Sequence, residues 1–244
     1  MSISVITCED KDTTLSQAVS KLAEILQSLK TEGRPVLLLL SGGSALKIPE
    51  YIGGEFLPLN LTISVLDDRF SADSRVNNFA QLMNTKLYKE ALTRGVKFID
   101  TRPQESENVE TLAERIDKSI KDWRTQNPNG AIIITQGVGP DGHTTGVMPF
   151  PEDEKVFRQM FLEGDKWVVG YNAEGKNEYP LRITATLKFL KEEVSESVVL
   201  MTGQEKKEAF ERVFAESGEL YITPARIIRD MKRVTVFTDI KIIE

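Results

Sequence analysis

The sequence predicts an α/β fold with a doubly wound, mostly parallel sheet. Three continuously apolar, β-rich runs, at residues 35–40, 131–135 and 197–202, are typical of strands covered on both faces. Between such runs lie segments whose apolar residues recur every three or four positions, as on one face of a helix. Strands that alternate with helices favour a parallel sheet with right-handed crossovers. Because no repeat or linker interrupts the pattern, we expect residues 1–244 to form a single domain.

The first half of the chain shows this alternation from its first residues. A β-rich run at 3–7 predicts an edge strand, and Asp12 or Thr13 can cap the amphipathic helix that follows over 15–29. The elements expected next are, in order, a strand at 35–40, a helical segment at 45–52, a strand at 61–66, a helix at 77–91 and a short strand at 96–99.

The second half begins with a long amphipathic helix over 107–124, a turn and the buried strand 131–135. Beyond Pro149 the pattern becomes looser. The elements expected there are strands at 166–171 and 181–187, a strand at 197–202, an amphipathic helix around 209–214, a short turn or helix at 224–228 and a last strand at 234–238.

Composition limits the class of protein. The 244 residues are 40% hydrophobic and 28% charged, as is ordinary for a globular domain, and the formal charge of −6 argues against non-specific binding of nucleic acid. The single Cys8 excludes an intramolecular disulfide. Neither a signal peptide nor an apolar run of about 20 residues is evident. We therefore expect a cytoplasmic monomer or small homo-oligomer without a nucleic-acid or membrane partner.

Polar loops follow four of the predicted strands, at 41–44, 67–69, 137–143 and 203–206. Because the carboxyl ends of parallel strands share one edge of a sheet, we expect these loops to lie together. They supply a Ser/Gly turn that can hold an anion, the cations Arg69 and Lys206, two carboxylates and the imidazole of His143. This set suits a phosphorylated polar substrate and proton transfer. The sequence has neither a dinucleotide nor a Walker A motif, and no ligand cluster indicates a metal.

Each of these side chains also has a structural interpretation. Arg69 can pair with the neighbouring aspartates, and Lys206 can be a solvated helix residue whose place in the site is taken by Lys207. Asp141 can shape its loop through hydrogen bonds to backbone N–H groups, or act directly beside His143.

The polar motifs together resemble those of the 6-phosphogluconolactonases, relatives of the glucosamine-6-phosphate deaminases, from about residue 10 to the C-terminus. The motifs are Leu40-Ser41-Gly42-Gly43-Ser44, Asp67-Asp68-Arg69, Gly137-Val138-Gly139-Pro140-Asp141-Gly142-His143, Arg182-Ile183-Thr184-Ala185-Thr186 and Gly203-Gln204-Glu205-Lys206. The resemblance implies a modified Rossmann-like fold. It also implies a carboxylic ester hydrolase of the oxidative pentose phosphate pathway, which converts 6-phosphogluconolactone to 6-phosphogluconate without a metal or nucleotide cofactor.

The resemblance also implies roles for individual residues. The substrate phosphate would be held by Ser41, Gly42, Gly43, Ser44, Arg69 and Lys206. Arg182 would add positive charge, unless it is structural. His143 would be the general base that activates water, Asp141 would orient it or tune its pKa, and Asp67 would lie near the sugar.

Departures from the family patterns bear on the choice of activity. Met148 stands where the deaminases have a glutamate that assists ring opening, and Arg69 stands where they tend to have tyrosine. Ala45-Leu46 replaces a Thr-Pro pair that often follows the Ser-Gly-Gly-Ser segment. An amino-sugar phosphate isomerase or deaminase and a non-catalytic sugar-phosphate sensor remain alternatives. Release of ammonia from glucosamine 6-phosphate would identify the first, and binding without turnover the second.

Overall fold

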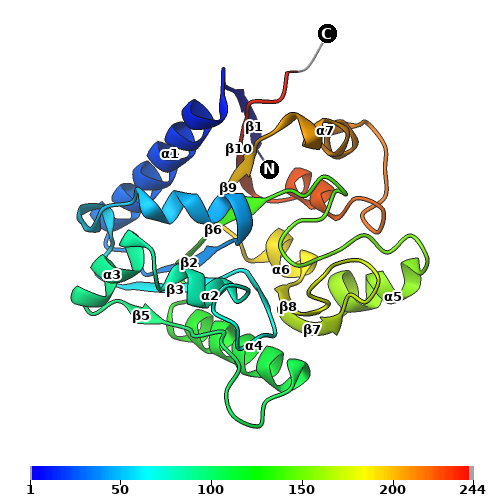
Figure 1. Ribbon diagram of the computed structural model, residues 1–244. Coiled ribbons are helices and arrows are strands. Elements are labelled where there is room, and N and C mark those ends of the chain that lie inside the picture. Colours follow the sequence, from blue (N-terminus) through cyan, green and yellow to red (C-terminus); the bar gives the residue numbers. More distant parts are fainter. Residues whose placement is uncertain (1, 242–244) are drawn as a thin grey trace.

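The computed structural model describes residues 2–241, and its larger sheet has seven strands in the order β1-β10-β9-β6-β2-β3-β5 (Figure 1). These strands are β1 Ser2–Thr7, β2 Val36–Leu40, β3 Leu61–Val65, β5 Lys97–Phe98, β6 Ala131–Gly137, β9 Glu196–Met201 and β10 Arg233–Thr238. All neighbouring pairs are parallel, and β1 lies at an edge. The predicted doubly wound, mostly parallel α/β fold is therefore confirmed.

Helices connect the strands and lie on both sides of this sheet (Figure 1). The α-helices are α1 Lys11–Thr31, α2 Asn78–Leu82, α3 Lys86–Thr93, α4 Val109–Gln126, α5 Glu154–Arg158, α6 Leu187–Glu192 and α7 Lys207–Phe214. The shorter turns of helix are η1 Gly43–Glu50, η2 Gly54–Phe56, η3 Gln159–Glu163, η4 Gln204–Lys206 and η5 Pro224–Arg229. Over residues 2–241, no helix combines the length and apolar character that crossing a membrane requires.

The start of α1 and the helix expected at 77–91 differ from expectation, because a side chain caps the helix at another residue. Asp10, rather than Asp12 or Thr13, caps α1 by accepting a hydrogen bond from the backbone N–H of Thr13 at 2.7 Å. The single helix expected at 77–91 is broken into α2 and α3, since the hydroxyl of Thr85 caps a new helix.

The central strand β2 shows why the sheet is buried on both faces. Leu37 and Leu39 pack into an apolar cluster with α4, α6 and α7 on one side. Val36, Leu38 and Leu40 pack with α1, α2 and α3 on the other side. All five side chains are fully buried. The continuous apolar run thus serves two cores, as expected of a parallel sheet with helices on each face.

A second, antiparallel sheet of three strands lies beside the first and corrects one expectation. Its strands are β4 Asp67–Arg69, β8 Leu181–Ala185 and β7 Val168–Asn172, in that order. The segment 67–69 was expected to be a loop at the end of β3, but it pairs with β8 so that Arg69 lies opposite Arg182. This pairing carries Arg182, from a distant part of the sequence, to the edge where the parallel strands end.

Candidate active site

The four predicted polar segments meet in one cavity of about 250 Å³ at the carboxyl edge of the parallel sheet. The predicted site residues that line it are Ser41, Gly42, Gly43, Ser44, Asp67, Arg69, His143, Arg182 and Lys206. The remaining one, Asp141, lies behind His143 and contacts it. The cavity wall also contains Asn78, Thr145 and Asn177, which the sequence did not suggest as site residues.

The Ser/Gly turn joins the end of β2 to η1 and exposes backbone donors to the cavity. The N–H of Ser41 is used, since it donates to the hydroxyl of Thr135 at 3.1 Å. Gly43 has a φ of +61°, which glycine adopts without strain. Gly43 is also the first residue of η1, and the N-cap residue Gly42 gives this helix no side-chain hydrogen bond. The first N–H groups of a helix lack helical partners, so this turn can hold an anion.

The adjacent aspartates of β4 have opposite surroundings, because successive residues of a strand point to opposite sides. The carboxylate of Asp68 accepts hydrogen bonds from three backbone N–H groups at 2.6–3.2 Å and from the Thr101 hydroxyl at 2.6 Å. Burial nevertheless raises the pKa of Asp68 to about 7. Asp67 faces the cavity instead, and its Oδ1 atom has no hydrogen-bond partner. Asp68 thus holds the local backbone, while Asp67 is available to a ligand.

Two guanidinium groups enter the cavity from the antiparallel sheet. The Arg182 side chain is buried, and its Nη1 lies 4.0 Å from Oδ2 of Asp67. Arg69 donates from Nη1 to the backbone oxygen of Val76 at 2.9 Å. Within residues 2–241, no ion pair joins Arg69 to either aspartate of β4. Burial raises the pKa of Asp67, while the charges of Arg182, Arg69 and His143 act to lower it.

Four buried side-chain polar atoms of the described residues lack a hydrogen-bond partner, and all four belong to this cavity. Two are donors, the Nε atoms of Arg69 and Arg182, and two are acceptors, the Oδ1 atoms of Asp67 and Asn78. An unpartnered buried polar group costs about 1–3 kcal/mol. A ligand that carries both an anionic group and hydroxyl donors has the chemistry to partner both kinds of atom.

His143 and Asp141 form a close pair at the mouth of the cavity. Nδ1 of His143 lies 2.5 Å from Oδ1 of Asp141, which also accepts the backbone N–H of His143 at 3.1 Å. Burial acts to raise the pKa of Asp141, but the hydrogen bond and charge of His143 outweigh it and lower that pKa. An ionised Asp141 keeps the proton on Nδ1, so Nε2 is the basic nitrogen. Asp141 therefore both shapes the loop and orients the imidazole.

Gly139 leaves the space that this pair occupies, and an added methyl group is expected to break the pair. A Cβ at residue 139 would lie 2.2 Å from Nδ1 of His143 and 2.6 Å from Oδ1 of Asp141. Gly139→Ala should therefore shift the imidazole ¹⁵N resonances, which are unambiguous because the chain has one histidine. Gly137→Ala is the matched control, since a Cβ there meets nothing within 4 Å. An unchanged imidazole spectrum in Gly139→Ala would contradict this prediction.

Lys206 reaches the cavity from the end of β9. The chain turns at Gly203, which has a φ of +103°, and enters η4, where Lys206 is half-buried. Burial lowers the pKa of Lys206, and the charge of Glu205 opposes this effect. Lys207 points elsewhere and forms an ion pair with Glu211 of α7, at 3.9 Å. The geometry thus selects Lys206, and not Lys207, as the cavity lysine.

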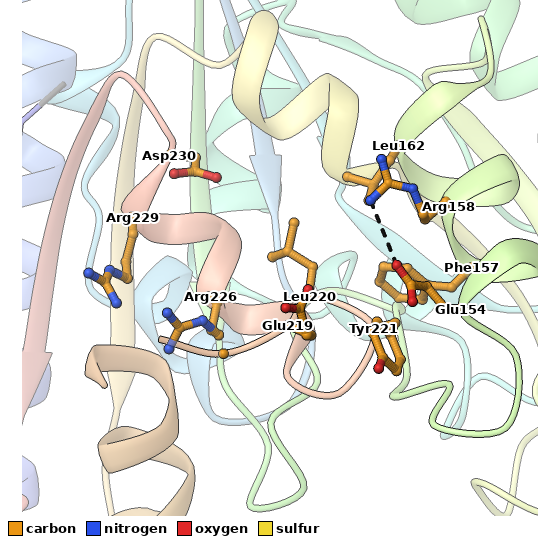
Figure 2. Close-up of a pocket in the computed structure, with 11 residues that line it drawn as sticks. Glu154, Phe157, Arg158, Leu162, Glu219, Leu220, Tyr221, Arg226, Arg229 and Asp230 are labelled. Atoms are coloured by element: carbon orange, nitrogen blue, oxygen red, sulfur yellow. Dashed lines mark ion pairs between the residues drawn. The ribbon is translucent and has the colours of Figure 1, made fainter. Parts of the chain in front are cut away.

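Another cavity, of about 340 Å³, lies between helix α5 and the segment that contains η5 (Figure 2). Its arginines already have partners. Nη1 of Arg226 donates to three backbone oxygens at the C-terminal end of α7, at 2.5–3.4 Å, and Arg229 donates to one of these oxygens. Arg158 pairs with Glu154 at 3.9 Å. Arg226 and Arg229 stabilise the C-terminal end of α7 and Arg158 is paired with a carboxylate, so this cavity does not resemble the first one chemically.

The family model described as glucosamine-6-phosphate isomerases/6-phosphogluconolactonase matches residues 9–237. Comparison with curated proteins gave no significant sequence match.

Several solved structures have the same fold. The 6-phosphogluconolactonase from Thermotoga maritima has a TM-score of 0.75 at 20% identity, covering 97% of this chain and 99% of that chain. The enzyme from Trypanosoma brucei has a TM-score of 0.74 at 18% identity, covering 97% and 96%. A 6-phosphogluconolactonase from Shewanella baltica has a TM-score of 0.71 at 20% identity, covering 97% and 96%.

Proposed function

The chain belongs to the glucosamine-6-phosphate isomerase/6-phosphogluconolactonase family, and we propose that it hydrolyses 6-phosphogluconolactone to 6-phosphogluconate. The observation that carries this proposal is the composition of one cavity. It contains a histidine oriented by a carboxylate, and two guanidinium groups that each have a buried, unpartnered Nε donor. The protein as a whole carries a charge of −6, so this local gathering of cations indicates an anionic ligand.

The phosphate end of the substrate is assigned to the donors on one side of the cavity. The backbone N–H groups and hydroxyls at 41–44 surround the anion, with Arg69 and Lys206 supplying charge. Arg182 adds a further positive charge beside Asp67. Binding of this remote, non-reacting group positions the lactone ring, which places the carbonyl carbon near His143.

Hydrolysis then needs one proton acceptor and one region of positive potential. Nε2 of His143 accepts a proton from water as the water oxygen bonds to the lactone carbonyl carbon. Cationic and N–H groups of the cavity stabilise the negative charge that develops on the carbonyl oxygen. The bond from that carbon to the ring oxygen breaks, and the imidazolium returns its proton to the departing oxygen. Asp141 holds the imidazole in the required tautomer and stabilises its charged form.

The surroundings of Met148 disfavour the other activity in the family name. The glutamate expected of a deaminase would stand at this position, but the Met148 side chain is buried in an apolar cluster. Its backbone N–H donates to the hydroxyl of Tyr171 at 3.2 Å. Proton transfer during ring opening would thus lack the carboxylate that the deaminases use.

The proposal is tested by following lactone generated in the cuvette and the 6-phosphogluconate formed from it. Purified protein should raise the rate clearly above that of spontaneous hydrolysis. Ammonia release from glucosamine 6-phosphate, without lactone turnover, would identify a deaminase. Binding of 6-phosphogluconate with no turnover of either substrate would identify a sensor.

Affinity for 6-phosphogluconate is expected to decrease at alkaline pH through Lys206. The ammonium form binds phosphate, and burial lowers the pKa of Lys206 below that of an ordinary lysine. As pH rises through this lowered pKa the lysine loses its charge, and the affinity should fall about tenfold. Calorimetric titrations between about pH 7 and 10 measure the change.

Two variants separate this effect from other titrations. In Lys206→Arg the side chain stays charged over the whole pH range, so the affinity of this variant for 6-phosphogluconate should not change with pH. Lys206→Met should bind weakly at every pH. A wild-type alkaline decrease that persists in Lys206→Met would assign the titration to a different group.

A further inference from the structure

Asn78 stands at the start of α2 and is fully buried, yet it lines the cavity. Its backbone N–H donates to the carboxylate of Asp68 at 2.6 Å, and this hydrogen bond fixes the position of the Asn78 backbone. The neighbouring wall residues are Gly42 and Asp67. The side chain therefore lies between the Ser/Gly turn and the acidic strand, and none of the predicted roles includes it.

The orientation of the Asn78 amide follows from its partner. Its Nδ2 lies 2.9 Å from the backbone oxygen of Asp67. A backbone oxygen can only accept a hydrogen bond, so the nitrogen must face it and Oδ1 must point the other way. Oδ1 is buried and has no partner within residues 2–241. The amide thus presents a fixed, unpartnered acceptor.

Gly42 holds the amide in place from its other side. A Cβ at residue 42 would lie 2.4–2.6 Å from the Oδ1, Nδ2 and Cγ atoms of Asn78, so the turn packs directly against the amide. The amide therefore cannot rotate freely to find another partner. Preorganised groups of this kind bind a matching ligand without losing much side-chain entropy.

The chemistry of the unpartnered oxygen identifies what it binds. An amide oxygen accepts hydrogen bonds and repels other acceptors, so it disfavours phosphate oxygens and favours a hydroxyl. Oδ1 of Asp67 is a second unpartnered acceptor, and the backbone of Asp67 joins the two residues. Donors at Arg69 and Arg182 are available for the anionic end. The cavity therefore has two acceptors suited to sugar hydroxyls, and that of Asn78 lies next to the Ser/Gly turn proposed to hold the phosphate.

We propose that Asn78 selects the substrate by accepting a hydrogen bond from one hydroxyl of the bound sugar. This inference rests on the proposed function, because it takes the ligand to be a phosphorylated sugar acid or its lactone. Asn78 would act on specificity and affinity, whereas the phosphate contacts would be made by other residues.

The test compares 6-phosphogluconate with inorganic phosphate by calorimetry. Asn78→Ala should weaken binding of 6-phosphogluconate about tenfold and leave binding of inorganic phosphate unchanged. Asn78→Ser serves as the second variant, should Asn78→Ala fail to fold. Equal losses for both ligands would overturn the inference, because Asn78 would then merely support the turn at Gly42.

Asn77 offers a matched control of the same residue type. It is also buried, but Oδ1 accepts the N–H of Ala80 at 2.8 Å and Nδ2 donates to the backbone oxygen of Arg69 at 3.4 Å. Asn77→Ala should lower the melting temperature and keep the ratio of the two affinities. A change of that ratio as large as in Asn78→Ala would overturn the inference.

A series of deoxy analogues of 6-phosphogluconate identifies the hydroxyl. Wild-type protein should bind one of the 2-, 3-, 4- and 5-deoxy compounds about tenfold more weakly than the parent, and Asn78→Ala should lose that discrimination. Discrimination that persists in the variant would overturn the inference while leaving the lactonase proposal intact. Wild-type protein that binds inorganic phosphate but not 6-phosphogluconate would overturn both.

Discussion

Replacing His143 with alanine is expected to lower kcat for 6-phosphogluconolactone by about 10²- to 10⁴-fold, the usual effect of removing a general base. The affinity for 6-phosphogluconate should change little, because the residues proposed to hold the phosphate lie in other segments. The physical reason is the geometry of the imidazole. Its Nδ1 is held by Asp141 at 2.5 Å, while its Nε2 forms no hydrogen bond within residues 2–241 and can accept a proton. Rates must be corrected for spontaneous hydrolysis of the lactone.

Asp141→Asn and Asp67→Asn show whether the proton acceptor is assigned correctly. An asparagine at residue 141 no longer stabilises an imidazolium and can fix the wrong tautomer, but the base itself remains, so we expect a smaller loss than in His143→Ala. Asp67 is the other acid at the cavity wall, and burial raises its pKa, as is often found for catalytic acids and bases. A normal kcat in His143→Ala together with a large loss of kcat in Asp67→Asn would identify Asp67 as the general base.

The parallel part of the fold could be predicted because its signals are local. The run at 131–135 is apolar and β-branched on both faces, and it becomes the core of β6 between two layers of helices. The glycines and polar residues at the ends of such strands marked where the strands stop. Since parallel strands end at one edge, the meeting of Ser41 with His143 and Lys206 followed from topology alone.

The antiparallel sheet could not be predicted, because its pairing is not local. β4 has three residues, all charged, and no alternation of polar and apolar positions distinguishes it from a loop. Its partner β8 is more than 100 residues away in sequence, and only the folded chain brings Arg69 opposite Arg182. The distinction between Asp67 and Asp68 depends on this pairing, since it determines which carboxylate faces the cavity.

Other parts of the site depend on conformations that composition does not reveal. Asn78 enters the cavity because Asp68 captures its backbone N–H, a contact that the sequence gives no reason to expect. Thr145 lines the same cavity with a φ of +53°, a value that residues other than glycine seldom adopt. Tertiary contacts hold Thr145 there, including one from its hydroxyl to that of Thr184 at 3.1 Å. Such strain is often found at functional sites.

Arg182→Met is expected to weaken binding of 6-phosphogluconate about 100-fold while changing the free energy of unfolding by less than about 1 kcal/mol. The buried guanidinium lies 4.0 Å from Asp67 and leaves its Nε without a partner. In the free protein its desolvation is therefore poorly compensated, so methionine can replace it at little cost. Removing the charge also removes an influence that lowers the pKa of Asp67, and Asp67 can then stay neutral by binding a proton.

Arg226→Met provides the matched control, because Arg226 is also buried but its Nη1 donates to three backbone oxygens at the end of α7. Losing these charge-assisted bonds should lower the free energy of unfolding by about 2–4 kcal/mol and leave the affinity for 6-phosphogluconate unchanged. Urea denaturation and calorimetry measure the two quantities. A strongly destabilised Arg182→Met with normal affinity would make Arg182 a structural residue. Weak binding with nearly unchanged stability in Arg182→Met, together with normal binding and lowered stability in Arg226→Met, would show that the unsatisfied guanidinium is maintained for the ligand.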